Sequence, residues 1–222
     1  MIEINHISKK YKKGSEEFIA LTDVSLKVGK GDYVSVSGPS GSGKSTLLNA
    51  IGGLIHPDSG EILFKGESIY DQNAKYLNSY RKRDVGFMFQ QFNLMPYLTV
   101  FENISLACYQ RSHARSIHHY LEECSLADIK DKYPSELSVG EKQRAAFIRA
   151  IISAPELLLA DEPTGNLDPG NSEILMSLVG EYHEKGGTVV LVSHDPVAVT
   201  YSNLHIKIDR GRILFPGQIP HI

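Results

Sequence analysis

One glycine-rich segment constrains the fold of this 222-residue chain more than any other. Residues 38–45 read GPSGSGKS and fit the spacing G-x-x-x-x-G-K-[ST]. The strand-like YVSVS precedes them, and a helical pattern runs from Lys44 to the glycine pair 52–53. Between a strand and a helix, such a loop lets backbone N–H groups surround a phosphate at the helix N-terminus. The segment therefore predicts an α/β fold that binds a nucleoside triphosphate, rather than a glycine-rich turn without a ligand.

Strand-like and helical patterns alternate in the second half of the chain. LLLA at 157–160 and TVVLV at 188–192 have strand length, and helical patterns follow at 171–185 and after Pro196. This order predicts a mostly parallel core sheet covered by helices on both faces. The first 30 residues instead alternate apolar and polar residues around polar turns, which predicts an N-terminal antiparallel β part.

The middle of the chain has a different character. Strand-like runs vanish between about 92 and 153, where helical segments with polar faces take over. We expect a single domain whose nucleotide-binding core comprises 1–91 and 154–222, with 92–153 inserted as a helical lobe.

Composition narrows the class of protein. The 23 Lys+Arg and 26 Asp+Glu give a formal net charge of −3, which argues against a dedicated nucleic-acid binder. No apolar run approaches the roughly 18 residues of a membrane helix. Cys108 and Cys124 are too few for a zinc site, and without a secretory signal we expect reduced thiols in a soluble, cytoplasmic protein.

LLLADE at 157–162 ends an apolar run with two carboxylates. The carboxyl end of a buried parallel strand is where α/β sheets bind ligands. There Asp161 would hold the hydration shell of Mg²⁺, and Glu162 would polarise an attacking water as general base. The alternative, acids that only cap the turn at Pro163, is weaker beside a phosphate-binding loop.

Six motifs occur in a fixed order: GPSGSGKS, FQ at 89–90, LSVGE at 137–141, LLLADE, NLD at 166–168 and SHD at 193–195. With them the chain resembles the nucleotide-binding subunit of an ABC transporter over essentially its whole length. VGFMFQQFNLMPYLTVFENI and DEPTGNLD most resemble the lipoprotein-releasing and macrolide-exporter group.

The resemblance implies roles for residues outside the glycine-rich loop. Tyr11 would stack on adenine, Gln90 would ligate Mg²⁺, His194 would contact the γ-phosphate, and Asp168 would face a partner subunit. The expected set is catalytic Glu162, His194 and Lys44; ATP-binding Tyr11, Gly38, Pro39, Ser40, Gly41, Ser42, Gly43, Lys44, Ser45, Thr46, Gln90, Ser138, Gly140, Glu141 and Asp168; and Mg²⁺-binding Ser45, Gln90 and Asp161.

LSVGE has two compatible interpretations. Ser138 and Glu141 have the spacing of a capping box, which starts a helix. In the family this segment, usually L-S-G-G-Q or L-S-G-G-E, presses against the γ-phosphate of the other subunit. Val139 replaces the first glycine, and our hypothesis is that Gly140 is the one whose bare backbone must approach phosphate. A β-branched residue adopts helical angles, so Val139 need not distort the helix start.

The resemblance further implies a homodimer with two ATP molecules at its interface. It would bind a separate membrane permease, partly through 92–104, at the inner face of the cell membrane. The alternatives are a cell-division ATPase that regulates a membrane partner without transport, and an ABC ATPase acting on DNA or ribosomes. The latter usually has two ATPase halves or long coiled coils, which this chain lacks. His113, His118 and His119 are interpreted as surface residues rather than a metal site.

Overall fold

The computed structural model describes residues 1–14, 16–194 and 196–218. The strands are β1 Ile2–Lys13, β2 Glu16–Val28, β3 Tyr33–Ser37, β4 Ser59–Phe64, β5 Glu67–Ser68, β6 Val85–Met88, β7 Leu157–Asp161, β8 Thr188–Val192, β9 Leu204–Asp209 and β10 Arg212–Gln218. The helices are α1 Lys44–Ile51, α2 Ala74–Arg83, α3 Val100–Ser105, α4 Arg111–Glu123, α5 Val139–Ile151, α6 Pro169–Glu184 and α7 Pro196–Thr200, with 3-10 turns η1 Ala127–Ile129 and η2 Pro134–Glu136.

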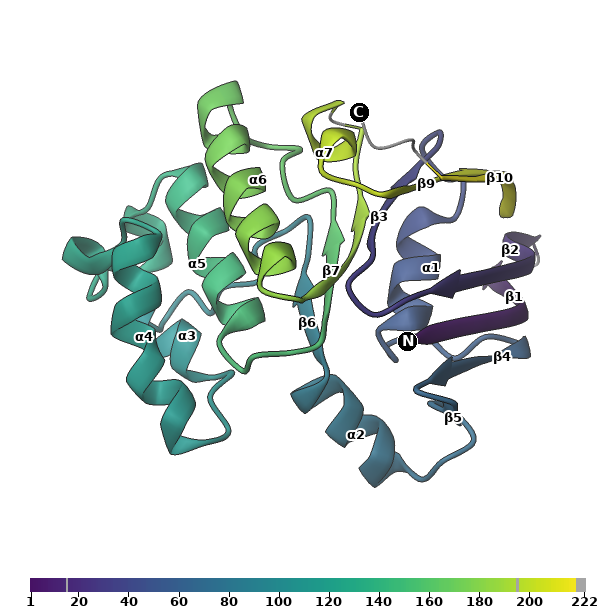
Figure 1. Cartoon of the computed structure of the whole chain (residues 1–222), viewed down its shortest axis with the longest axis horizontal. Helices are drawn as coiled ribbons and strands as arrows, with labels where there is room; N and C mark the ends of the chain where they lie inside the picture. Colours follow the sequence, from purple (N-terminus) through teal and green to yellow (C-terminus); the bar gives the residue numbers. More distant parts are fainter. Residues whose placement is uncertain (15, 195, 219–222) are drawn as a thin grey trace.

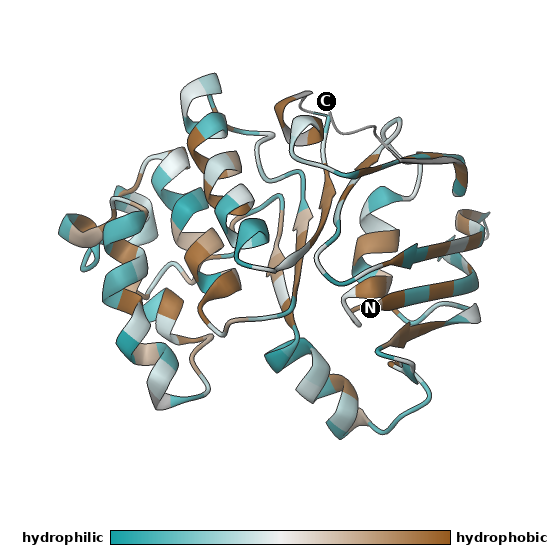
Figure 2. Ribbon diagram, viewed as in Figure 1, coloured by the Kyte–Doolittle hydropathy of each residue, from teal (hydrophilic) through white to brown (hydrophobic). Residues whose placement is uncertain are grey.

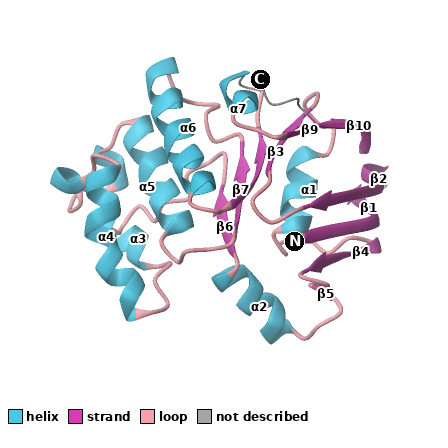
Figure 3. Cartoon of the chain, viewed as in Figure 1, coloured by secondary structure: helices cyan, strands magenta, loops and turns pink. Residues whose placement is uncertain are grey.

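A six-stranded sheet forms the centre of the molecule, in the order β10-β9-β3-β8-β7-β6 (Figures 1 and 3). All of its neighbouring strands are parallel except β9 and β10, which pair antiparallel. Every residue of β8 is buried, and so are the first four of β7. Strands covered on both faces need apolar residues at every position, which explains the continuous runs LLLA and TVVLV.

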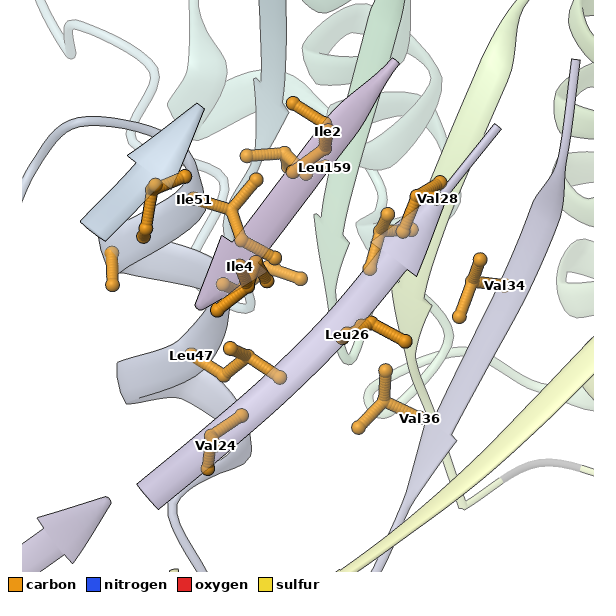
Figure 4. Packing of buried hydrophobic residues seen from close by; sticks show 14 of the residues in the cluster. Ile2, Ile4, Val24, Leu26, Val28, Val34, Val36, Leu47, Ile51 and Leu159 are labelled. Atoms are coloured by element: carbon orange, nitrogen blue, oxygen red, sulfur yellow. The ribbon is translucent and has the colours of Figure 1, made fainter. Parts of the chain in front are cut away.

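A smaller antiparallel sheet has the order β2-β1-β4-β5. Helix α1 lies between it and the larger sheet (Figure 1). Figure 4 shows Ile4 and Leu26 of the small sheet packed with Leu47 and Ile51 of α1 and Leu159 of β7. Burial of one such side chain contributes about 1.5–3 kcal/mol to folding. This shared core fixes α1, and the glycine-rich loop before it, against both sheets.

Among the described residues, 92–153 hold only helices and turns. These helices pack on one another and on α6 through a second core cluster. Figure 2 shows apolar residues along the central strands and mixed polar and apolar residues on α4 and α5. The fold class is as predicted, whereas the division into a core and a lobe at 92 and 153 stays a prediction.

Two details differ from the sequence-based expectation. The structure contains helix α2, which the sequence did not predict, because its sequence AKYLNSYRKR is mostly polar and only Tyr80 of it is buried. The hairpin of β1 and β2 is longer than the alternating stretches, because the first four residues of β2 are all exposed and show no alternation. Helix α6 lies within two residues of the expected 171–185.

No helix in the described part of the chain is both long and apolar enough to span a bilayer.

A fully buried asparagine holds the loop before α3. The two N–H groups of Asn103 Nδ2 are shared among the carbonyl oxygens of Met95, Leu98 and Thr99, which lie 3.1, 2.9 and 2.9 Å from the nitrogen. Its Oδ1 accepts from the Met95 N–H at 2.7 Å. One side chain thus binds four backbone groups of residues 95–99, which belong to no strand and precede the first turn of α3.

We expect Asn103→Leu, which keeps the size but removes all four bonds, to lower the free energy of unfolding by about 2–4 kcal/mol. Urea denaturation followed by circular dichroism measures this change. Gln72→Leu, at an exposed position before α2, is the control and changes stability little. Equal stability of the two variants would contradict the proposed role of Asn103.

Candidate functional site

The carboxyl ends of β3, β7 and β8 meet at one edge of the larger sheet, because β8 pairs in parallel with both β3 and β7. The glycine-rich loop follows β3, Asp161 ends β7, and His194 lies two residues after β8. Gln90 follows β6, which pairs in parallel with β7. Residues from four distant parts of the sequence therefore come to the same edge.

Neighbouring backbone fixes the shape of the glycine-rich loop. Gly38 has a φ of 148°, and a Cβ added there would lie 2.0 Å from the Ile208 carbonyl oxygen of β9. Gly43 has a φ of 107°, and its Cβ would lie 2.2 Å from the Ala20 carbonyl oxygen of β2. Only glycine fits both positions, so the loop is held in place by strands of both sheets.

The loop carries groups suited to phosphate. Lys44 is buried, and its Nζ donates to the carbonyl oxygens of Gly38 and Pro39 at 2.8 and 2.9 Å. The buried Ser42 hydroxyl has no hydrogen-bond partner among the described residues. Gly43 caps α1 without a side-chain bond, which leaves the first N–H groups of the helix available. A cation, a free hydroxyl and a helix N-terminus together form an anion site.

Oxygen ligands for a divalent cation lie beside this loop. The Ser45 hydroxyl donates to Asp161 Oδ1 at 3.1 Å. Burial raises the pKa of the Asp161 carboxyl, against the lowering effects of Ser45 and Lys44. Hydroxyl and carboxylate oxygens suit Mg²⁺, which is usually held by few protein ligands together with phosphate oxygens. Within the described residues no three His, Cys, Asp or Glu side chains gather as a metal site.

Glu162 and His194 contact each other at the same edge. His194 Nε2 lies 3.2 Å from Glu162 Oε1, and the Glu162 side chain is 20% exposed. Glu162 has a left-handed φ of 48°, and its N–H donates to the Val192 carbonyl oxygen at 2.8 Å. The bond to β8 holds the strained residue in place, so its carboxylate has a defined position beside His194.

The start of α5 is the capping box that the sequence predicts. Ser138 Oγ accepts from the Glu141 N–H at 3.3 Å, and Glu141 Oε2 accepts from the Ser138 N–H at 2.7 Å. The latter bond lowers the pKa of the Glu141 carboxyl. Val139 is helical and 42% exposed, whereas Gly140 is buried. The valine side chain therefore leaves the helix start undistorted.

The remaining predicted residues lie in varied surroundings. Tyr11 of β1 is exposed and pairs across the hairpin with Phe18, an exposed aromatic that the sequence analysis did not select. Asp168 caps α6. Gln90 is exposed and has no described hydrogen bond. The loop residues Pro39, Ser40 and Gly41 are exposed, and Thr46 is half-buried in α1.

The three histidines of α4 form no shared site. His118 and His119 are exposed, and His119 lies 3.2 Å from Glu123 on the next turn. His113 stacks edge-on against Tyr109. His118 and His119 are surface residues as predicted, whereas His113 is partly buried and its Nδ1 has no hydrogen-bond partner among the described residues.

A model of the ABC transporter family matches residues 21–165. The chain belongs to this family. YknY of Bacillus subtilis, an ABC transporter ATP-binding protein, is 40% identical over 219 residues, which cover 96% of this chain and 95% of YknY. LolD of Shewanella oneidensis, a lipoprotein-releasing system ATP-binding protein, is 36% identical over 222 residues, which cover 97% and 96%.

A solved structure gives the same fold. The dimeric ATP-binding cassette MJ0796 of Methanocaldococcus jannaschii, bound to ADP and Pi, has a TM-score of 0.92 at 34% identity, over 100% of both chains. This chain is thus an ABC transporter ATP-binding subunit with the ABC ATPase fold. The predicted resemblance to the lipoprotein-releasing and macrolide-exporter group is consistent with the presence of LolD among the relatives of this chain.

Asp161 is expected to lower stability at neutral pH. Its folded pKa is raised, so the fold disfavours the ionised form. Below the ordinary pKa of an aspartate, about 3.9, the carboxyl is protonated in both the folded and the unfolded chain, so it costs no folding free energy. Above the raised folded pKa, the full destabilisation by the ionised carboxylate is present. Asp161→Asn, which still accepts from Ser45, should therefore raise the thermal unfolding midpoint at pH 7, and the gain should shrink as the pH falls toward 4.

Thermal unfolding between pH 4 and 7 tests this expectation in the absence of nucleotide and Mg²⁺. Asp71→Asn, at an exposed position, is the control and should shift the midpoint little at either pH. A lower midpoint for Asp161→Asn at pH 7 would show that the carboxylate stabilises the fold.

Proposed function

We propose that the chain is the ATP-hydrolysing subunit of an ABC transporter and that two copies close on two ATP molecules to drive a separate membrane permease. The observation that carries the proposal is the shared strand edge, where Lys44, Ser45, Asp161, Glu162 and His194 meet. Each site would combine the 38–45 loop of one chain with the 138–141 segment of the other. The dimeric form of the similar cassette MJ0796 supports the homodimer.

In this mechanism Lys44 and the loop N–H groups bind the β- and γ-phosphates. Ser45, Asp161 and Gln90 would hold Mg²⁺, which when bound neutralises charge on the phosphate oxygens. Glu162 accepts a proton from the water whose oxygen attacks the γ-phosphorus, while the bond from that phosphorus to the β–γ bridging oxygen breaks. His194, at 3.2 Å from Glu162, fixes the carboxylate, and we propose that it also contacts the γ-phosphate.

The capped start of α5 suits the partner half of such a site. Its free N–H groups and the helix dipole attract anions, and Val139 and Ser138 are exposed rather than covered by the chain itself. Phosphoryl transfer depends mainly on positioning and charge stabilisation, so a site completed by closure is chemically adequate.

Glu162→Gln should reduce ATP turnover by roughly 10² to 10⁴, the usual contribution of a general base, with ATP binding retained. Steady-state phosphate release and binding of a fluorescent ATP analogue measure the two properties. Glu184→Gln at the exposed end of α6 is the matched control. Turnover close to that of the unmodified chain would remove Glu162 from its proposed role.

The segment proposed to meet the permease has both packed and exposed parts. Val100 and Ile104 are buried in the core of the helical region, whereas Met95 and Tyr97 are 38% and 71% exposed. Arg149 donates to the carbonyl oxygens of Phe92 and Asn93 at 2.7 and 2.6 Å. Packing within the chain and docking of a partner are therefore compatible.

A groove of about 400 Å³ lies along the edge strand β6, and Arg149, which binds Phe92 and Asn93, is part of its lining. Its lining includes apolar Val85, Phe87 and Leu106. The charged residues in its described lining are Arg81, Lys82 and Arg149, all of them cationic. An apolar floor with a cationic rim suits a short cytoplasmic helix that carries acidic residues, and we propose that the permease supplies one.

Lys82→Glu should weaken co-purification of a co-expressed permease by about tenfold or more, because the new carboxylate would repel the acidic residues of the proposed permease helix. Lys75→Glu, also on α2 but outside the groove lining, is the matched control. ATP turnover of the isolated subunit should be the same in both. Equal permease recovery would exclude the groove as the docking surface.

The identity of 36% with LolD supports a permease of the lipoprotein-releasing or exporter type. In such systems the ATP cycle moves force through the permease to the far side of the membrane. The subunit would then lie at the inner membrane face only through its partner.

A further inference from the structure

Asn171, in the first turn of α6, lies between two segments proposed to face the partner subunit. Its backbone N–H donates to Asp168 Oδ1 at 3.0 Å, and its Nδ2 donates to Asp168 Oδ2 at 2.6 Å. Both carboxylate oxygens of Asp168 are therefore bound by one residue. These bonds lower the pKa of the Asp168 carboxyl, although the side chain is exposed.

The other end of the Asn171 amide is bound by α5. Arg144 Nη1 donates to Asn171 Oδ1 at 2.9 Å. The same guanidinium donates through Nε to the Cys124 carbonyl oxygen, at the end of α4, at 3.0 Å. The amide oxygen thus accepts from the Arg144 guanidinium, and the amide N–H donates to the Asp168 carboxylate. A charged partner on each side fixes the orientation of the amide.

Gly140 brings the start of α5 against this amide. A Cβ added at Gly140 would lie 2.2 Å from Asn171 Oδ1 and 2.6 Å from its Cγ. The clash is not easily relieved, because Asp168 and Arg144 hold the amide on both sides. Within a single chain, the glycine is required so that the first turn of α5 contacts α6.

We infer that Asn171 is a positioning residue that sets Asp168 and the 138–141 segment relative to each other. The two segments then reach the partner subunit as one unit, and a change at one displaces the other. The inference rests on the proposed function, since it concerns the surface that closes on ATP. It also gives Gly140 a second role beside close approach to phosphate.

Aspartate at 171 would keep the acceptor for Arg144 but would place a carboxylate against that of Asp168. Serine would lose both bonds but would leave room for a Cβ at Gly140. These two substitutions separate the hydrogen bonds from the packing.

The test uses the full chain with Glu162→Gln, in which ATP is bound but not turned over. Dimerisation is measured by analytical ultracentrifugation at several ATP concentrations, and ATP affinity of the monomer is measured with a fluorescent analogue. Asn171→Asp should weaken ATP-dependent dimerisation about tenfold while changing monomer ATP affinity less than about twofold. Asn73→Asp, at the N-cap of α2, is the matched control and should change neither, because either residue caps a helix.

The decisive comparison is a double-mutant cycle. Gly140→Ala and Asn171→Ser should each weaken dimerisation, and the double variant should lose less than the sum of the two single losses, because the smaller side chain accommodates the new methyl group. Strictly additive losses in the double variant would overturn the inference and leave phosphate approach as the reason for the glycine. Failure of the Glu162→Gln parent to dimerise with ATP would instead overturn the proposed function and, with it, this inference.

Discussion

The parallel pairing of β8 with both β3 and β7 is the constraint on which the site depends. Each strand by itself delivers one kind of group: a phosphate-binding loop, a pair of acids or a histidine. Their chemistry is complementary only if their carboxyl ends coincide, and parallel register ensures that. The burial of β7 and β8 on both faces then makes the arrangement rigid, because neither strand shifts without exposing a run of apolar residues.

The second sheet contributes to the same site from the other side. Ala20 of β2 touches Gly43, and Ile208 of β9 touches Gly38, so the loop is clamped at both ends by backbone. Lys44 adds two bonds to carbonyl oxygens within the loop. The loop is therefore shaped before a phosphate arrives, and little binding energy is lost in ordering it.

The features that could be predicted from the sequence are those that depend on a short local pattern of residues. The glycine-rich loop, the two buried strands and the capping box of α5 each follow from a short run of residues, and each has the predicted form. Helix α2 and the outer part of the β1–β2 hairpin were missed because little of either is buried, so no apolar periodicity marks them. Asn171 was missed for another reason. Its partners Arg144 and Gly140 lie about thirty positions away, and one asparagine three residues after a helix cap carries no signal of that contact.

At Glu162 the requirement for a carboxylate conflicts with the backbone conformation, which would be more stable with glycine. A side chain with a Cβ in the left-handed region costs about 1–2 kcal/mol relative to glycine. A glycine there would relax the backbone but would have no carboxylate, so the more stable protein would lack the proposed base. Descendants of this chain released from the need to hydrolyse ATP would gain stability by losing Glu162. Glycine at this position in a similar sequence would thus mark a subunit that has kept its fold and ceased to be an enzyme.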